Sequence, residues 1–266
     1  MNLFDIKDKV VVITGGTGVL GRAIAAHLAE EGAKVVILGR KAEVGNAQVE
    51  EIRSKGGEAM FLTTDVMDRA KLEKNLEDIL AAYGRVDALL NAAGGNMPGA
   101  TISPDGTFFD LKTEDFQQVL NLNLTGTVLP TQVFLKPMVE QKKGAIVNFS
   151  SMAAFRPLTR VCGYAAAKAG ISNFTAYMAT EVAKKFGEGI RVNAIAPGII
   201  ETKMVDSMDD KVMTTMIRYN TLNRKGLTSE IAAACAYLVS EDASYITAQT
   251  IRVDGGGQNF VSTINK

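Results

Sequence analysis

The stretch Val10-Val-Val-Ile-Thr-Gly-Gly-Thr-Gly-Val-Leu-Gly21 decides the fold of this chain. A β-branched run leads directly into a glycine-rich turn, and an alanine-rich helical segment follows at once. Glycines let such a turn bend tightly and approach a pyrophosphate, whose charge is stabilised by free N–H groups and by the dipole of the following helix. A glycine-rich turn can also connect two elements without binding a ligand, but the strand before it and the helix after it favour dinucleotide binding.

The rest of the chain repeats the pattern of a short β-branched run followed by a longer helical segment. The runs expected to form strands are residues 10–13, 34–38, 59–62, 88–90, 145–149, 191–195 and 250–253. Segments rich in Ala, Leu, Glu and Lys separate them, which indicates parallel strands joined by crossover helices. We therefore predict an α/β fold in which residues 1–266 form a single domain. Its core is a Rossmann-type, doubly wound parallel sheet of about seven strands with helices on both faces.

Composition excludes several classes of function. The 266 residues are 47% hydrophobic, and the 29 Lys and Arg equal the 29 Asp and Glu, so charge does not favour a nucleic-acid partner. The single histidine, His27, excludes a multi-histidine metal centre, and we predict no metal. Cys162 and Cys235 have neither zinc nor redox spacing, which indicates two free thiols in a reducing compartment.

The chain also shows no feature of membrane or secreted proteins. Its first residues mix charged and apolar side chains without the apolar run of a secretory signal. No apolar stretch reaches the length that spans a membrane. We expect a cytoplasmic protein with a small-molecule substrate and no membrane partner.

Two connections are unusually long for this fold. Residues 94–111 contain four glycines and two prolines, and residues 197–228 are rich in Met and Thr. Long loops in a compact domain are more often functional than accidental, and both follow predicted strand ends. Open α/β sheets bind ligands at that carboxyl edge, so we interpret both segments as substrate loops.

Two charged residues at strand ends bear on the cofactor. Arg40 stands where an acidic residue would bind a ribose 2′-hydroxyl, and a guanidinium suits a 2′-phosphate, which favours NADP over NAD. The alternative for Arg40 is a solvated side chain stacked on adenine. Asp65 ends the third strand and could accept a hydrogen bond from an adenine amino group. It could equally cap the helix that begins near Asp68.

The pair Tyr164 and Lys168 is the strongest catalytic signal. They stand at positions i and i+4 of a helix-forming run, so the phenol and the ammonium share one helix face. Ser151 ends the strand that precedes this helix. Asn121 and Asn123 place polar amides in a long helical stretch that should pack on the sheet, which indicates a specific role for them.

Taken in order, these motifs resemble the short-chain dehydrogenase/reductase superfamily, from Thr14 to the Asp254-Gly-Gly256 segment. The resemblance implies that Asn123, Ser151, Tyr164 and Lys168 form the catalytic set. In that reading Tyr164 exchanges the proton, and the Lys168 ammonium and the oxidised nicotinamide lower a phenol pKa that is ordinarily about 10. Ser151 would bond the carbonyl oxygen, Lys168 would also hold the cofactor ribose, and Asn123 would position a proton-relaying water.

The resemblance also implies a cofactor site, a mobile substrate lid after Pro197 and a homotetramer. The expected NAD(P)-binding residues are Thr14, Gly15, Thr17, Gly18, Val19, Leu20, Gly21, Arg40, Asp65, Val66, Asn91, Ala92, Ala93, Gly94, Tyr164, Lys168, Pro197, Gly198, Ile200 and Thr202. The chain departs from the usual pattern at three positions. Val19 replaces a glycine, Ala92 replaces an asparagine, and Ala167 replaces a common serine.

Substrate choice rests on shorter segments. The segments around residues 94–98, 108–111, 129–134 and 151–161 resemble the D-mannonate oxidoreductase, or fructuronate reductase, branch of the superfamily. With Ser151 and Tyr164, we expect Asn96, Met152 and Arg160 to bind substrate, Arg160 through the carboxylate of a sugar acid. The alternatives are a surface ion pair for Arg160 and a turn-stabilising amide for Asn96. The segment after Gly198 resembles 3-oxoacyl reductases, which keeps a ketoacyl or sugar-alcohol substrate open, as well as a dinucleotide-binding sensor without turnover.

Overall fold

The computed structural model describes residues 4–156, 158–202, 205, 210–218 and 220–257. Seven parallel strands form one sheet in the order β3-β2-β1-β4-β5-β6-β7. The strands are β1 (Val10–Thr14), β2 (Lys34–Gly39), β3 (Glu58–Thr63), β4 (Ala88–Asn91), β5 (Gly144–Phe149), β6 (Ile190–Pro197) and β7 (Thr250–Val253). Each strand contains the run predicted for it. The predicted doubly wound parallel sheet is confirmed.

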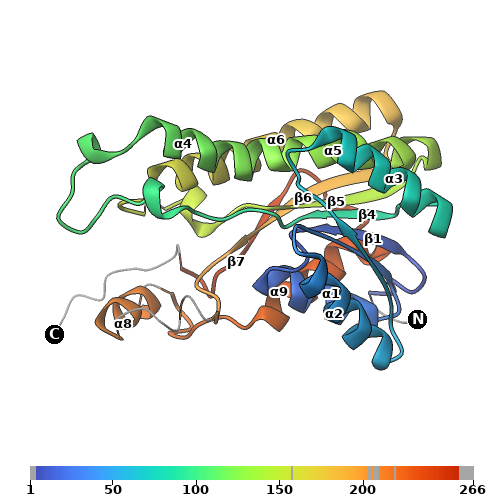
Figure 1. Cartoon of the computed structure of the whole chain (residues 1–266), viewed down its shortest axis with the longest axis horizontal. Helices are drawn as coiled ribbons and strands as arrows, with labels where there is room; N and C mark the ends of the chain where they lie inside the picture. Colours follow the sequence, from blue (N-terminus) through green and yellow to red (C-terminus); the bar gives the residue numbers. More distant parts are fainter. Residues whose placement is uncertain (1–3, 157, 203–204, 206–209, 219, 258–266) are drawn as a thin grey trace.

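Helices cover both faces of this sheet. They are α1 (Val19–Glu30), α2 (Ala42–Ser54), α3 (Arg69–Tyr83), α4 (Thr113–Leu120), α5 (Gly126–Gln141), α6 (Cys162–Phe186), α8 (Asp210–Arg218) and α9 (Thr228–Val239). Figure 1 shows α3, α4, α5 and α6 above the sheet, and α1, α2 and α9 below it. The strand order reverses between β1 and β4, and sheets of this kind bind ligands outside the carboxyl ends of the strands at that point.

Alternate residues of the strands supply two hydrophobic cores. Val11 and Ile13 pack with Leu28 of α1 in one cluster, while Val10 and Val12 pack with residues of α3 and α5 in the other. All four strand residues are almost completely buried. Because both faces are covered, the strands consist of nearly continuous hydrophobic runs, as expected for a parallel sheet.

The register of the strands aligns their carboxyl ends. Thr14 of β1 lies opposite Asn91 of β4, and Asn91 lies opposite Asn148 of β5. Inside the sheet, the Asn91 amide donates to Asn148 Oδ1 at 2.9 Å and to Thr131 Oγ1 of α5 at 3.0 Å. The glycine turn, the loop after β4 and Ser151 after β5 therefore all leave the sheet at the same edge.

A five-residue π-helical turn, Asn121–Thr125, separates α4 from α5. Its buried member, Asn123, uses its amide to bond both the Val119 carbonyl of α4 and the backbone of the loop after β4. Asn121 lies on the surface side and accepts a hydrogen bond from Gln117 at 3.0 Å. The predicted interruption of the helix thus has a physical origin, and π-turns of this kind are frequent at functional sites.

The two long connections differ in how much of them is described. Residues 94–111 contain two short 3-10 turns, Pro98–Ala100 and Phe108–Asp110. In the connection over residues 197–228, residues 203–204, 206–209 and 219 lie outside the described residues, so the predicted lid is described only in part. Its described ends meet where Ile200 pairs with Gly226 in a parallel bridge.

Membrane-spanning helices, cysteines and metal-binding groups are the features that bear on the classes of protein disfavoured by the sequence. Within the described residues, none of the helices combines the length and apolar character that crossing a membrane requires. Cys162 and Cys235 are free thiols, and Cys235 is buried in α9. In the same part of the chain, no group of three or more His, Cys, Asp or Glu side chains is arranged to hold a metal ion.

Candidate active site

The glycine-rich turn between β1 and α1 is shaped by contacts that exclude side chains. Gly15 has a φ of +63°, and a Cβ on it would lie 2.7 Å from the Ala93 Cα atom. A Cβ on Gly21 would lie 2.4 Å from the Gly15 carbonyl oxygen. Only glycine avoids both clashes, so the backbone forms an open cradle at the start of α1. Val19 needs no such freedom, because it is the first residue of α1 and is 54% exposed.

A cavity of about 230 Å³ adjoins this cradle. It is lined by Gly15, Thr17, Gly18, Leu38, Gly39, Arg40, Thr64, Asp65, Val66, Ala92, Ala93, Gly94 and Leu122. Nine of the expected cofactor residues therefore share one cavity with the phosphate-binding turn. Sequence reasoning missed Leu38, Gly39, Thr64 and Leu122. The first three had a usable signal, since they sit at the ends of β2 and β3.

Arg40 and Asp65 are the two charged residues in the wall of this cavity. The exposed Arg40 side chain has no hydrogen bond or ion pair with the described residues, so its guanidinium is available to a ligand. Asp65 accepts a hydrogen bond from the Met67 N–H at 2.9 Å. Capping of α3 is done by Asp68, which accepts from the Lys71 N–H at 3.0 Å. The helix-cap alternative for Asp65 was therefore wrong, and its carboxylate lines the cavity.

Other expected cofactor residues lie beside this cavity rather than in its wall. Thr14 is buried and accepts a hydrogen bond from the Ala93 N–H at 3.2 Å, which fixes the loop after β4 to β1. Asn91 is buried inside the sheet. Leu20 and Gly21 belong to the first turn of α1. Pro197, Gly198, Ile200 and Thr202 follow β6, and the Thr202 hydroxyl accepts from the Val205 N–H at 3.2 Å.

The four predicted catalytic residues gather at the same edge. Ser151 follows β5, and its side chain lies near that of Tyr164 in the first turn of α6, close enough to lower the pKa of the phenol. Ser151 Oγ also accepts from the Ala153 N–H at 3.1 Å, which leaves its own O–H free to donate. Lys168 lies one turn further along α6, with Nζ 5.4 Å from the centroid of the Tyr164 ring and 2.8 Å from the Phe149 carbonyl oxygen.

Asn123 is joined to this group through the loop after β4. Its Oδ1 accepts from the Gly95 N–H at 3.0 Å, and its Nδ2 donates to the Gly95 carbonyl at 2.7 Å and to the Val119 carbonyl at 2.9 Å. A Cβ on Gly94 would lie 2.6 Å from Asn123 Oδ1 and 3.2 Å from Lys168 Nζ. Asn123 and Lys168 thus flank the same glycine.

Burial dominates the electrostatics of Tyr164 and Lys168. It raises the pKa of Tyr164, and the hydrogen bond from Ser151 lowers that pKa in part. Burial also lowers the pKa of Lys168 to about 8. The expected lowering of the Tyr164 pKa by Lys168 is therefore not seen in the chain itself. The ammonium lies over the ring and donates to the Phe149 carbonyl, whereas the phenol lies near the Ser151 hydroxyl.

The expected substrate residues lie in the segments that follow β4 and β5. Met152 opens the short 3-10 turn that follows Ser151. Arg160 has a φ of +73°, and its Nε donates to the Ile102 carbonyl at 2.5 Å, while the Ile102 N–H donates back to the Arg160 carbonyl at 3.0 Å. Asn96 donates to the Thr101 hydroxyl at 2.7 Å, which is the turn-stabilising contact of the alternative reading. Arg160 therefore joins the loops that follow β4 and β5.

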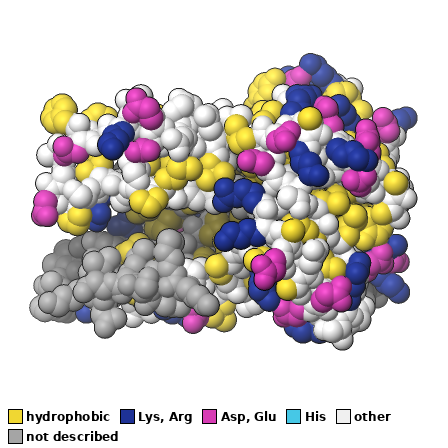
Figure 2. Space-filling view, in the orientation of Figure 1, with side chains coloured by type: hydrophobic (Ala, Val, Ile, Leu, Met, Phe, Trp, Pro, Cys, Tyr) yellow, Lys and Arg dark blue, Asp and Glu magenta, His cyan; other side chains and the backbone are white. Residues whose placement is uncertain are grey.

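The space-filling view shows this edge of the molecule at the left. In Figure 2 the surface below α4 is hollowed, with hydrophobic side chains visible inside the hollow and Lys or Arg side chains at its inner end. Such a combination suits a ligand that has an uncharged ring and acidic groups.

Comparisons with known proteins agree with this geometry. A family model described as enoyl-(acyl carrier protein) reductase matches residues 17–258. The uncharacterized oxidoreductase UxuB of Bacillus subtilis (strain 168) is 42% identical, over 95% of each chain. The 3-oxoacyl-[acyl-carrier-protein] reductase FabG of Thermotoga maritima is 35% identical, over 94% of this chain and 98% of its own.

Among solved structures, a proposed D-mannonate oxidoreductase from Haemophilus influenza with bound NAD is similar in fold and sequence. It has a TM-score of 0.91 and 33% identity, and the match covers 97% of this chain and 98% of that chain. These matches extend over nearly the whole length of the chain. The chain therefore belongs to the short-chain dehydrogenase/reductase family of NAD(P)-dependent oxidoreductases.

Proposed function

We propose that this oxidoreductase interconverts a keto-uronate and an aldonate of the D-fructuronate and D-mannonate type. The observation that carries the chemical part of the proposal is the contact between Ser151 and Tyr164, with Lys168 one helical turn away, at the edge that also holds the glycine cradle. This arrangement supports a proton donor, an oxygen-binding hydroxyl and a dinucleotide site at one edge of the sheet.

Each catalytic residue has a role that its surroundings support. The cradle and the residues of the adjoining cavity would hold the nicotinamide cofactor, which when bound would supply or accept the hydride. In reduction, the Tyr164 O–H donates its proton to the carbonyl oxygen of the substrate. The Ser151 O–H would turn to the same oxygen and bond it as negative charge develops there. Lys168 keeps a positive charge near the phenol, and Asn123 holds the loop after β4 in place.

The sugar-acid substrate is supported by two kinds of likeness. The segments around the site resemble the D-mannonate oxidoreductase branch, and the similar solved structure is of a protein with that proposed activity. Arg160 lies in the segment between β5 and α6, and its terminal guanidinium nitrogens suit a carboxylate while Nε bonds Ile102. A cofactor preference follows from Arg40: we propose NADP, with NAD as the alternative because the similar structure holds NAD.

The second candidate is reduction of a 3-oxoacyl substrate. The FabG proteins of Thermotoga maritima and other bacteria favour it, with identities of 35–36% over nearly the whole chain. The same catalytic residues would serve that reaction. The third possibility, a dinucleotide-binding sensor, is disfavoured because all four catalytic residue types are present. Assembly as a homotetramer stays a prediction.

The test of the proposed function is a substrate screen with the purified protein. D-Fructuronate, D-mannonate, neutral keto-sugars and a 3-oxoacyl thioester are each supplied with NADH or NADPH, or with the oxidised cofactor, and kcat/KM is measured. We expect the keto-uronate to have the highest value. A preference for the thioester would establish the second candidate. Cofactor binding by fluorescence titration, with no turnover on any substrate, would favour the sensor.

The first prediction concerns the proton donor. Tyr164→Phe should lower kcat by about 10³-fold, because a positioned general acid typically contributes 10²–10⁴-fold, while the affinity for NADPH changes little. Tyr177→Phe is the matched control, since Tyr177 lies on the same helix but is 59% exposed. Retained activity in Tyr164→Phe would reject Tyr164 as the acid.

The second prediction concerns the buried ammonium of Lys168. Its pKa falls from 10.5 in the unfolded chain to about 8 in the folded chain, so charged Lys168 opposes folding below pH 8. The penalty disappears as pH rises from about 8 to 10.5, because over that range the unfolded state binds more protons.

Lys168→Met should therefore abolish turnover and yet stabilise the fold by about 2 kcal/mol at pH 7, after allowance for the lost bond to Phe149. The gain should shrink at pH 10. Thermal or denaturant unfolding at both pH values measures it. A variant less stable than wild type at pH 7 would contradict the prediction.

The third prediction separates the two roles of Arg160. Arg160→Ala loosens the contact with Ile102 for every substrate, but it removes a carboxylate partner only for sugar acids. We expect KM for the keto-uronate to rise at least about ten-fold more than KM for a neutral ketone, as for loss of a charge-assisted hydrogen bond. Equal changes in both KM values would exclude Arg160 from carboxylate recognition.

A further inference from the structure

The chain beyond β6 returns to the fold through a narrow junction. Ile200 pairs with Gly226, the Gly226 N–H donates to the Ile199 carbonyl at 2.9 Å, and the Glu201 N–H donates to the Gly226 carbonyl at 2.8 Å. We call residues 199–201 and 224–227 the neck. The neck brings together the two ends of the stretch of chain between residues 201 and 224.

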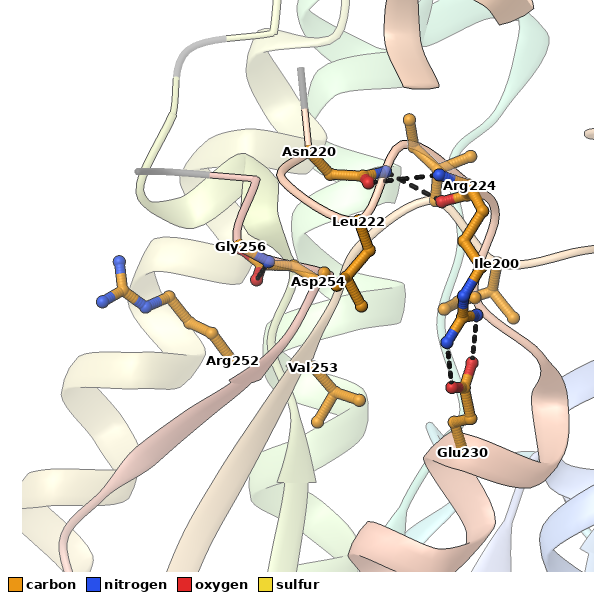
Figure 3. Close-up of a pocket in the computed structure, with 12 residues that line it drawn as sticks. Ile200, Asn220, Leu222, Arg224, Glu230, Arg252, Val253, Asp254 and Gly256 are labelled. Carbon is orange, nitrogen blue, oxygen red and sulfur yellow. Dashed lines mark hydrogen bonds and ion pairs between the residues drawn. The ribbon is translucent and has the colours of Figure 1, made fainter. Parts of the chain in front are cut away.

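A bidentate ion pair between Arg224 and Glu230 joins the neck to α9. Arg224 Nη1 lies 2.9 Å from Glu230 Oε2, and Arg224 Nη2 lies 2.6 Å from Glu230 Oε1, as the parallel dashed lines in Figure 3 show. Glu230 Oε2 also accepts from the Leu227 N–H at 2.7 Å at the start of α9. These contacts lower the pKa of Glu230 to about 2, so the carboxylate stays charged throughout the physiological range.

The backbone of Arg224 is fixed as firmly as its side chain. The buried Asn220 donates to the Arg224 carbonyl at 2.9 Å and accepts from the Arg224 N–H at 3.3 Å. The Leu222 N–H donates to the Gly255 carbonyl at 3.1 Å, which attaches this segment to the chain after β7. The neck therefore connects three elements, β6, α9 and β7, around a cavity of about 190 Å³ (Figure 3).

The same frame fixes the residues that leave β6. The Gly198 N–H donates to the Val253 carbonyl at 3.0 Å, and a Cβ on Gly198 would lie 2.7 Å from the Asp254 Cα atom. Gly198 and Ile200 are among the residues expected to contact the cofactor. Their position is thus set on one side by β7 and on the other by the neck.

We propose that Arg224, acting through Glu230, is a positioning residue for ligand binding. The inference rests on the proposed function, because it concerns the same cofactor and substrate site. Neither side chain touches the reacting atoms. Their pairing holds residues 198–202 in one arrangement before the ligands arrive, so that binding need not order them.

If Arg224 has this role, its loss should weaken ligand binding and leave the rate of turnover nearly unchanged. The catalytic residues lie on β5, α6 and the π-turn, and their contacts do not pass through the neck. Loosening the neck therefore raises the cost of binding without changing the bound geometry of the reacting groups. Stability should change little as well, because both members of the pair are partly exposed, at 48% and 39%.

The experiment compares Arg224→Gln and Glu230→Gln with wild type. Glutamine at position 230 can still accept from the Leu227 N–H, so only the ion pair is removed. Arg69→Gln is the matched control, since Arg69 forms an ion pair of similar exposure with Glu73, remote from the neck. Measurements are KM and kcat, NADPH affinity by titration, melting temperature, and backbone hydrogen exchange of the free protein.

We expect KM to rise about three- to ten-fold in both variants, with kcat within about two-fold of wild type. The Glu201 and Gly226 amides should exchange faster, and the double variant should be no worse than either single one. The Arg69→Gln control should match wild type in every measurement except a small change in melting temperature.

Other outcomes overturn the proposal. If KM and the hydrogen-exchange rates are unchanged, the pair of Arg224 and Glu230 positions nothing. If kcat and the melting temperature fall together while KM rises, the pair has a merely structural role. If wild type turns over none of the substrates, the proposed function fails. The hydrogen-exchange rates and the NADPH affinity still test whether Arg224 is a positioning residue.

Discussion

The alignment of the carboxyl ends of β1, β4 and β5 is the constraint on which the rest of the site depends. The parallel ladder places Thr14 beside Asn91, and Asn91 beside Asn148. The bond between the two asparagine amides, 2.9 Å long, lies inside the sheet where no water competes with it. A slip of one residue would break it and would turn the buried hydrophobic residues of the strands to the wrong faces. Three chain segments consequently leave the sheet level with one another, and each carries part of the site.

Gly94 shows how closely these segments meet. It has no side chain at the point where Asn123 and Lys168 approach from different elements, and a single methyl group there would collide with Asn123 and crowd Lys168. The amide of Asn123 bonds both backbone groups of Gly95, so the π-turn and the loop after β4 fix each other. The polar residue that interrupts the helix is therefore a link between elements, which compensates for the irregular backbone that contains it.

Local patterns explain what the sequence alone could predict. Alternation of β-branched and helical runs located every strand, and the spacing of four between Tyr164 and Lys168 placed both on one face of α6. Contacts between distant residues leave no such pattern. The bond from Arg160 to Ile102 joins residues 58 apart, and the pairing of Asn123 with Gly95 joins residues 28 apart. Asp65 and Asp68 were ambiguous because both precede α3 within one turn, and only the backbone geometry selects Asp68 as the cap.

The burial that makes Tyr164 and Lys168 useful also opposes charge on both. It raises the pKa of the phenol and lowers that of the ammonium, so the chain alone favours a protonated Tyr164 that is ready to donate. A site held together mainly by attraction between these two groups would loosen whenever either changed protonation. Neutral hydrogen bonds hold α6 instead. Asn148 donates to Thr175 at 2.9 Å, and Ser150 donates to the Lys168 carbonyl at 3.1 Å. Because those bonds do not titrate, the helix keeps its place against β5 while the proton moves.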